Sequence, residues 1–384
     1  LIHGRSSNEE KSYPLETTEL INKYPSSKNT LDFGLYWKVW DLLKEKYVDK
    51  NLLDSQKLMY GSINGMLRAT GDPYSVFFSP EETKAFQEDM EGSFEGIGAE
   101  LGIKDKILTI IAPLEDTPAQ KSGLRAGDKI IKIDDKLSAD LTIDEAVDLI
   151  RGKKGTEVTL TILRAGEEKT KEIKIVRANI IVKSVKFELK PDKIAYVKIS
   201  KFGEDTLREF NQAVNKILDV EARGIILDLR NNPGGYLKKS IEIASLLMPK
   251  DKTVVIEEDN TGNKEYSKTF GGDKLSSIPM VALINEGSAS AAEILAAALR
   301  DNQQTTLIGK KSFGKGYVQE LITLPQKSSV KITVAKWLTP NGDYITEKGI
   351  SPDIEVDMTD EDYNNNRDPQ LDKALEIIKE KVNQ

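Results

Sequence analysis

The stretch from about residue 190 to 310 alternates apolar, strand-like runs with amphipathic, helix-like segments, and this alternation limits the fold more than any other feature. Strands separated by helices imply a mostly parallel sheet with right-handed crossovers. The run Ile225–Leu227 is unbroken, as expected of a strand buried on both faces. We predict an α/β core with strands near 194–199, 225–227, 253–256, 279–284 and 306–308, and helices near 207–218, 237–248 and from about 289.

Residues 93–178 follow a different pattern, which predicts a compact β-rich module with one principal helix inserted ahead of the core at 179–358. The helix is expected over 143–150, with Thr142 as its cap and Glu145 completing a capping box. Alternating apolar residues predict one of its strands: Val158, Leu160 and Ile162.

Both ends of the chain are polar or helical. We interpret residues 1–33 as a polar tether and 34–92 as a helical region whose helices serve packing. One helix face is formed by apolar residues at helical spacing: Leu35, Val39, Leu42 and Leu43. Residues 79–82, Ser-Pro-Glu-Glu, predict a second helix with a capping box. Residues 359–384 predict a helical tail whose last helix is capped by Asp368.

Composition restricts the chemistry. The formal net charge of -7 argues against nucleic acid as a partner, because neutralising phosphates requires a basic face. Cysteine is absent, which excludes disulfides and thiol nucleophiles. The single histidine, His3, lies in the polar terminal stretch, so a Ser-His-Asp triad and a histidine-rich zinc site are both disfavoured. We expect no metal or cofactor, and any hydrolytic chemistry needs a base other than histidine.

The sequence contains no apolar run close to the ~18 residues of a membrane-spanning helix. Its first residue is Leu1 rather than methionine. We therefore leave open a signal or membrane anchor that lies N-terminal to this chain.

Two strand exits in the core have unusual sequences, and ligands of open parallel sheets gather at such exits. Asn231–Gly235 ends in two glycines, which allow backbone amides to approach a ligand closely, although an ordinary turn is an alternative. Asn285–Glu293 is rich in small residues and places serines at the start of a helix. There a hydroxyl would lie near free N–H groups, although Ser288 or Ser290 could simply cap the helix.

A third segment places Lys315 between Gly314 and Gly316, just after a predicted strand. A buried lysine can lose its proton and act as a base, for which its pKa must fall from about 10.4 to roughly 7–8. Gln319 could then hold the amine in place. A flexible surface lysine is the alternative. Together the three segments could supply a nucleophile, a base and oxyanion donors for acyl transfer without histidine.

Five segments of the chain resemble segments of one known family: Gly71–Tyr74, Leu229–Gly235, Asn285–Ala291, Phe313–Gln319 and Gly349–Asp353. On these the chain is identified as a member of the carboxyl-terminal processing peptidases, serine–lysine endopeptidases of peptidase family S41. The resemblance runs over about residues 35–358. It implies a core similar to the crotonase and Clp-protease superfamily.

The resemblance also implies roles for particular residues. Ser290 would be the nucleophile, Lys315 the base and Gln319 its orienting partner. The backbone N–H groups of Gly235 and Ala291 would form the oxyanion hole, with Gly234 as the weaker alternative. The chain departs from many family members at Ala292, which replaces a serine; that position is not the attacking one.

For residues 93–178 the resemblance implies a PDZ domain, in which Gly96, Ile97 and Gly98 would hold the terminal carboxylate of a substrate. Arg151 could couple this domain to the core or be an ordinary surface charge. The expected partner is a protein or peptide with a free C-terminus, and a homo-oligomer is left open. Family members act in the bacterial envelope or the thylakoid lumen, so we expect an extracytoplasmic location.

Two other functions compete with a peptidase. One is a catalytically silent binding protein that uses the same fold and the PDZ domain. The other is an acyl-CoA enzyme of the related crotonase fold. The joint presence of Ser290, Lys315 and Gln319 disfavours the first, and the inserted PDZ domain disfavours the second.

Overall fold

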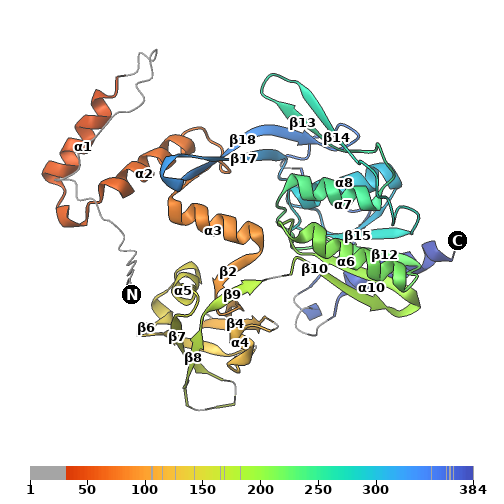
Figure 1. Ribbon diagram of the computed structural model, residues 1–384, viewed down its shortest axis with the longest axis horizontal. Helices are drawn as coiled ribbons and strands as arrows, with labels where there is room; N and C mark the ends of the chain where they lie inside the picture. Colours follow the sequence, from red (N-terminus) through yellow and green to blue (C-terminus); the bar gives the residue numbers. More distant parts are fainter. Residues whose placement is uncertain are drawn as a thin grey trace, which may run out of the picture. The chain divides into compact units, whose positions relative to one another are not determined.

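The computed structural model describes residues 32–383, apart from 105, 106, 115, 126, 142, 165, 168, 182, 347, 360, 363, 364 and 366. The chain divides into two compact units. Figure 1 labels the helices and strands of both. The N-terminal unit contains the described residues up to Thr83, together with Gln319–Thr333. The larger unit contains Lys84–Val318 and the described residues from Val334 on. Most of the predicted tether and the predicted Thr142 cap lie outside the described residues.

The larger unit is built on a six-stranded sheet. Its strands, in spatial order, are β10 (Val185–Lys190), β11 (Ile194–Ile199), β12 (Gly224–Asp228), β15 (Met280–Ile284), β16 (Thr306–Gly309) and β19 (Ile354–Glu355). All neighbouring pairs are parallel except β10 and β11, which are antiparallel. The predicted α/β class with a mostly parallel sheet is therefore confirmed.

Helices cover both faces of this sheet. The four helices are α6 (Thr206–Asp219), α7 (Leu237–Leu247), α8 (Ala291–Gln303) and α10 (Pro369–Val382). Alternate residues of each strand point to opposite faces. Ile225 and Leu227 of β12 lie in a core with side chains of α6, α7 and α8, whereas Ile226 between them packs with Ala374 and Ile378 of α10.

The strand predicted near 253–256 forms, but in a second, antiparallel sheet. It is β13 (Thr253–Asp259), which pairs with β14 (Lys264–Lys268) and with residues 335–338 of β18 (Ser329–Leu338). A tight turn joins β13 to β14, where the Asp259 side chain accepts hydrogen bonds from Thr261 and Asn263. A turn this short allows only antiparallel pairing, so the expectation of one parallel sheet was wrong for this strand.

The predicted PDZ module has its own antiparallel sheet. Its elements are β3 (Ala99–Lys104), β4 (Ile107–Pro113), α4 (Pro118–Lys121), β5 (Lys129–Ile133), β6 (Lys136–Leu137), α5 (Ile143–Ile150), β7 (Glu157–Leu163) and β8 (Lys171–Val176). The module begins and ends in a strand pair, β2 (Ser93–Gly96) with β9 (Ala178–Ile181). Val158, Leu160 and Ile162 of β7 are fully buried, as their alternation predicted. A compact β-rich module with one principal helix is thus confirmed.

The N-terminal unit contains α1 (Gly34–Lys46), α2 (Ser55–Arg68), β1 (Val76–Phe78) and most of β17 (Tyr317–Thr323). The capping box at α3 (Pro80–Glu91) is confirmed: the Ser79 N–H donates to the Glu82 carboxylate at 2.7 Å, and the Glu82 N–H donates to Ser79 Oγ at 3.2 Å. Short 3-10 turns occur in both units of the described chain: Lys50–Leu52 and Pro325–Lys327 in the N-terminal unit, and Ser138–Asp140 and Pro191–Lys193 in the larger one.

The packing role predicted for the first helix is wrong within the described part of the chain. On the α1 face, Leu35 is 77% exposed and Val39 is 50% exposed, and Trp40 is the buried residue of the helix. Helical spacing identifies an apolar face, but it does not say what covers that face. No helix among the described residues combines the length and apolar character needed to cross a bilayer.

Candidate active site

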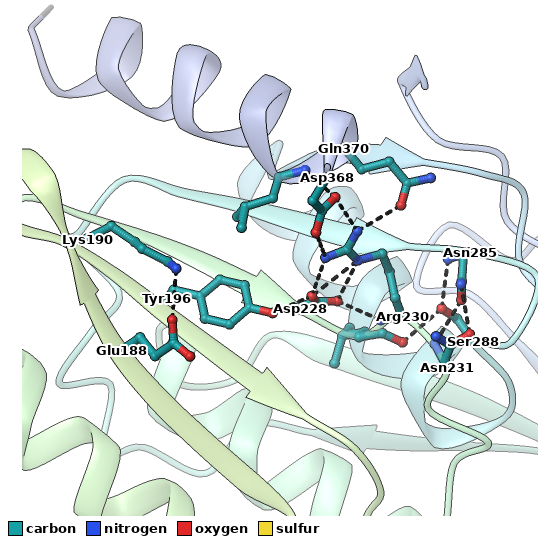
Figure 2. Close-up of polar contacts among 12 residues, drawn as sticks. Glu188, Lys190, Tyr196, Asp228, Arg230, Asn231, Asn285, Ser288, Asp368 and Gln370 are labelled. Carbon is teal, nitrogen blue, oxygen red and sulfur yellow. Dashed lines mark hydrogen bonds and ion pairs between the residues drawn. The ribbon is translucent and has the colours of Figure 1, made fainter. Parts of the chain in front are cut away.

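The loops after β12 and β15 form one hydrogen-bonded structure, because these strands are parallel neighbours. Asn231 and Asn285 bond to each other twice: the Asn231 N–H donates to Asn285 Oδ1 at 2.8 Å, and Asn285 Nδ2 donates to Asn231 Oδ1 at 2.9 Å (Figure 2). The Ala289 N–H donates to the carbonyl of Asn232 at 2.9 Å. The two loops that the sequence singled out therefore have a fixed relative position.

Gly234 lies close to the backbone of the second loop. A Cβ atom at this residue would lie 2.8 Å from Ser290 Cβ and 3.0 Å from the Ala291 nitrogen, and its φ of 101° also favours glycine. The Gly234 N–H already donates to Asn232 Oδ1 at 2.9 Å. By contrast, the N–H groups of Gly235 and Ala291 have no acceptor among the described residues. They are the available donors at this site; their role in an oxyanion hole stays a prediction.

The two serines of the second loop differ sharply in their surroundings. Ser288 is fully buried, and its hydroxyl donates to the Leu229 carbonyl at 2.8 Å and accepts from the Asn285 N–H at 2.9 Å. It joins the two loops and does not cap the following helix. Ser290 is the N-cap of α8, half-buried, with φ 53° and ψ -116°. Side-chain-bearing residues rarely adopt this conformation, and such strain gathers at functional sites.

Glu293 connects the nucleophile segment to the lysine segment. This side chain, in the first turn of α8, is completely buried. Its Oε2 accepts the backbone N–H of Ser290 at 2.8 Å and that of Lys315 at 3.0 Å. Its Oε1 accepts the Ser312 hydroxyl at 2.6 Å and the Gly314 N–H at 2.7 Å. One carboxylate thus fixes the backbone of both candidate catalytic residues.

The charge of Glu293 is unfavourable for folding. Burial raises the pKa of its carboxyl above the usual range, although the hydrogen bonds from Ser312 and three backbone N–H groups act in the opposite direction. Because the folded-state pKa is raised, ionising the group costs stability as the pH rises through that value. A buried carboxylate kept despite this cost indicates a functional site. Glu293 was not among the residues predicted from the sequence, although it is a lone charge within the apolar helix 291–299.

The segment around Lys315 is held from several sides. The Phe313 N–H donates to the Ser288 carbonyl at 3.0 Å, and Trp337 Nε1 donates to the Lys315 carbonyl at 2.8 Å. The Trp337 N–H donates to the Gly316 carbonyl at 3.1 Å. The side chain of Lys315 is half-buried. This backbone is not that of a mobile surface loop, which disfavours the alternative of an ordinary surface lysine.

The segment Gly349–Asp353 is hydrogen-bonded to the lysine segment. Ile350 and Ser312 bond to each other twice, through the Ile350 N–H to Ser312 Oγ at 2.7 Å and the Ser312 N–H to the Ile350 carbonyl at 3.0 Å. Asp353 Oδ2 accepts the N–H of Leu307 in β16 at 2.7 Å. This segment therefore anchors Ser312, which in turn donates to Glu293.

A buried ionic network supports the start of the loop after β12 (Figure 2). Arg230 Nη2 contacts Asp228 Oδ2 at 2.7 Å and Asp368 Oδ2 at 2.8 Å, and Tyr196 donates its hydroxyl to Asp228 Oδ2 at 2.6 Å. Burial tends to raise the pKa of Asp368, but hydrogen bonds from Arg230 and the Leu371 N–H leave it below its usual value. Asp368 is also the predicted cap of α10, which the Leu371 bond at 3.0 Å confirms. The network ties α10 to the loop that carries Gly235.

The remaining predicted residues belong to β17 and to the PDZ module. Gln319 is in the N-terminal unit, on β17, and its Nε2 donates to the Tyr74 carbonyl at 2.9 Å.

In the PDZ module, Gly96 ends β2, Ile97 is buried, and Gly98 has φ 78°. The N–H groups of Ile97 and Gly98 have no acceptor among the described residues, as a carboxylate-binding loop would require. The guanidinium of Arg151 lies 4.9 Å from the ring centre of Phe94.

Glu293→Gln is expected to lower kcat by about 100-fold, the cost of a misplaced catalytic group. A glutamine oxygen can serve one pair of donors, but its NH2 group would face the other pair donor to donor. Steady-state kinetics and the melting temperature would be measured together. Glu286→Gln, at an exposed position of the same loop, is the control and should behave like the parent. A Glu293→Gln variant with the parental kcat would remove Glu293 from the site.

Comparison with known proteins divides the chain in the same order. The model of peptidase family S41 matches residues 193–356, a PDZ domain model matches 109–164, and the model of the activating protease CtpB N-terminal domain matches 6–83. The first range includes the loops that carry Gly235, Ser290 and Lys315.

Individual proteins give the same picture. The chain is 39% identical over 343 residues to carboxy-terminal processing protease CtpA of Bacillus subtilis, covering 89% of this chain and 73% of the relative. It is 38% identical over 327 residues to CtpB of the same organism, covering 84% and 67%. Among solved structures it resembles the photosystem II D1 C-terminal processing protease, with 28% identity and a TM-score of 0.54, covering 84% and 92%.

Proposed function

This chain belongs to peptidase family S41 and is a serine-type peptidase of the carboxy-terminal processing group with a PDZ domain, and on that premise we propose which residues act and how substrates are chosen. Ser290 is the nucleophile, Lys315 is the general base, and Gln319 orients the lysine amine. The observation that carries this proposal is the buried Glu293 carboxylate, which binds the backbone of Ser290 and Lys315 through the same oxygen.

The proposed reaction begins with Lys315 in its neutral form. Its amine takes the proton from Ser290 Oγ as the oxygen attacks the scissile carbonyl. The N–H groups of Gly235 and Ala291 stabilise the resulting oxyanion; losing one such donor typically costs about 100–1000-fold in rate. The protonated lysine then gives its proton to the leaving amine. Water, deprotonated by Lys315, hydrolyses the acyl-enzyme and regenerates the serine.

Substrate choice is proposed to depend on the PDZ domain. A substrate's C-terminal residues would add as a strand to the domain, with the terminal carboxylate accepting from the N–H groups of Ile97 and Gly98. These two groups lack acceptors among the described residues, and the carbonyl groups of the same loop are held by Ala119 and Leu114 at 2.8 and 2.9 Å. The domain would thereby deliver protein substrates with a free C-terminus to the active site.

Amidation of a substrate's C-terminus is expected to lower its turnover roughly tenfold or more at limiting concentration, because charge-assisted hydrogen bonds to the carboxylate are lost. Matched protein substrates that differ only in this group would be compared. A short peptide with a free C-terminus should inhibit cleavage of the free-acid substrate, and its amidated form should not. Equal turnover of the two substrates would refute C-terminal recognition while leaving the peptidase assignment in place.

We also propose that the chain acts outside the cytoplasm, in the bacterial envelope. The support is the resemblance to a family whose members act there. The rival function, a catalytically silent binding protein, is disfavoured because the buried Glu293 carboxylate bonds the backbone of both Ser290 and Lys315, the two residues that a binding protein would not need to hold together.

A further inference from the structure

The turn Gly71–Tyr74 has no role in the reaction described so far, although it is one of the segments that the family resemblance rests on. It is a tightly bonded turn in the N-terminal unit. Asp72 Oδ1 accepts the Tyr74 N–H at 2.9 Å, and Asp72 Oδ2 accepts the Ser75 hydroxyl at 2.5 Å. Ser75 Oγ accepts the N–H of Thr333 in β18 at 3.1 Å. The carboxylate of Asp72 therefore fixes the position of the Tyr74 peptide group.

The Tyr74 carbonyl accepts a hydrogen bond from Nε2 of Gln319 at 2.9 Å. A carbonyl oxygen can only accept, so it selects the NH2 end of the glutamine amide and not the oxygen end. The orientation of the amide is thereby determined by chemistry. The opposite end of the amide, Oε1, is a hydrogen-bond acceptor.

We infer that the Gly71–Ser75 turn is a positioning element for catalysis, which fixes the end of the Gln319 amide that serves the lysine base. The inference rests on the proposed role of Gln319. A neutral amine has one lone pair and two N–H donors. An amide oxygen accepts one of those donors and leaves the lone pair available for the serine proton. An amide NH2 group would instead donate to the lone pair and compete with that proton.

The β-structure of the N-terminal unit supports this assignment. The turn leads directly into β1, which pairs with residues 329–331 of β18. β17, which carries Gln319, pairs with β18 as well. The turn and Gln319 are thus attached to the same strand. The N-terminal unit accordingly contains both Gln319 and the turn that bonds its amide.

The test is a double-mutant cycle on the rate constant of cleavage, measured in single-turnover experiments with a peptide substrate. Gln319→Ala is expected to lower the rate about tenfold or more, and Asp72→Ala to lower it by a similar factor. If the turn acts only through Gln319, the double variant should be no slower than Gln319→Ala alone. Multiplying effects in the double variant, or a parental rate for Asp72→Ala beside a slow Gln319→Ala, would overturn the inference.

A control variant separates positioning from general damage to the unit. Asp54→Ala removes the N-cap of α2, where Asp54 Oδ1 accepts from Gln56 and Lys57 at 2.8 and 2.9 Å. Any effect of Asp54→Ala on rate should multiply with that of Gln319→Ala. If Asp72→Ala does not fold, Ser75→Ala decides, because it removes the bonds to Asp72 and Thr333 alone and is expected to show the same lack of additivity.

The failure of this inference can be told apart from failure of the proposed mechanism. A parental rate for Gln319→Ala would show that Gln319 has no part in the reaction, which refutes its proposed role. A slow Gln319→Ala variant whose defect multiplies with that of Asp72→Ala would leave that role intact and refute only the positioning by the turn.

Discussion

Ser290→Ala is expected to abolish peptide hydrolysis, with a loss in kcat on the order of 10⁶-fold, as when the nucleophile of a serine peptidase is removed. The chain should stay folded, because alanine keeps the Cβ atom and the backbone bond from the Ser290 N–H to Glu293 at 2.8 Å. The measurement is single-turnover cleavage with the melting temperature recorded alongside.

Ser288→Ala is the matched control for this variant. It removes a buried hydroxyl that bonds to Leu229 and Asn285. We expect it to lose stability, by about 1–3 kcal/mol, yet to retain Ser290 chemistry in the folded fraction. An inactive Ser288→Ala beside an active Ser290→Ala would reverse the assignment of the nucleophile.

Lys315→Arg is expected to be inactive although it preserves the positive charge. A guanidinium stays protonated at every accessible pH and cannot take the proton of Ser290. Losing a general base typically costs about 10²–10⁴-fold in rate, so kcat should fall by at least about 100-fold. The rates would be measured between pH 6 and 10, where a neutral amine but not a guanidinium can form.

Lys311→Arg provides the comparison, since Lys311 is exposed and lies in the same connecting segment. It should hydrolyse peptide at the parental rate. Parental activity in Lys315→Arg would show that the amine is not the base, whatever its position.

Local sequence signals predicted most of the elements. The helix starts at Ser79 and Asp368 were correct because a capping residue and the N–H group that it bonds lie within three residues of each other. The strand pattern through Val158, Leu160 and Ile162 was correct because alternate side chains of a strand meet one core. The unbroken run at Ile225–Leu227 correctly indicated a strand covered on both faces, because Ile225 and Leu227 meet one core and Ile226 meets another.

Features that depend on distant partners were not predicted. β13 has the apolar pattern of a core strand, but a tight turn and β18, about 80 residues later, place it in another sheet. The apolar spacing of α1 indicated packing, yet Leu35 and Val39 are exposed in the described part of the chain. In each case the residues specify the element and its apolar face, and the partner is decided by long-range topology.

The candidate site shows the same limit. Ser290 and Lys315 could be singled out because small residues and glycines around a reactive side chain are visible along the chain. Glu293 was missed because its importance lies in four donors, of which three come from one segment 19 to 22 residues away and one comes from its own helix start. A charged residue inside an otherwise apolar helix is the sequence signal that such a partner set exists.

Reaction with a fluorophosphonate, followed by mass spectrometry of the labelled peptide, tests the central claim most directly. Under conditions in which the chain hydrolyses peptide, we predict a single phosphonylated residue, Ser290, and loss of hydrolysis in proportion to labelling. Lys315→Arg should label far more slowly, and Lys311→Arg at the parental rate. Labelling at Ser288, or hydrolysis that persists in a fully labelled enzyme, would contradict the account.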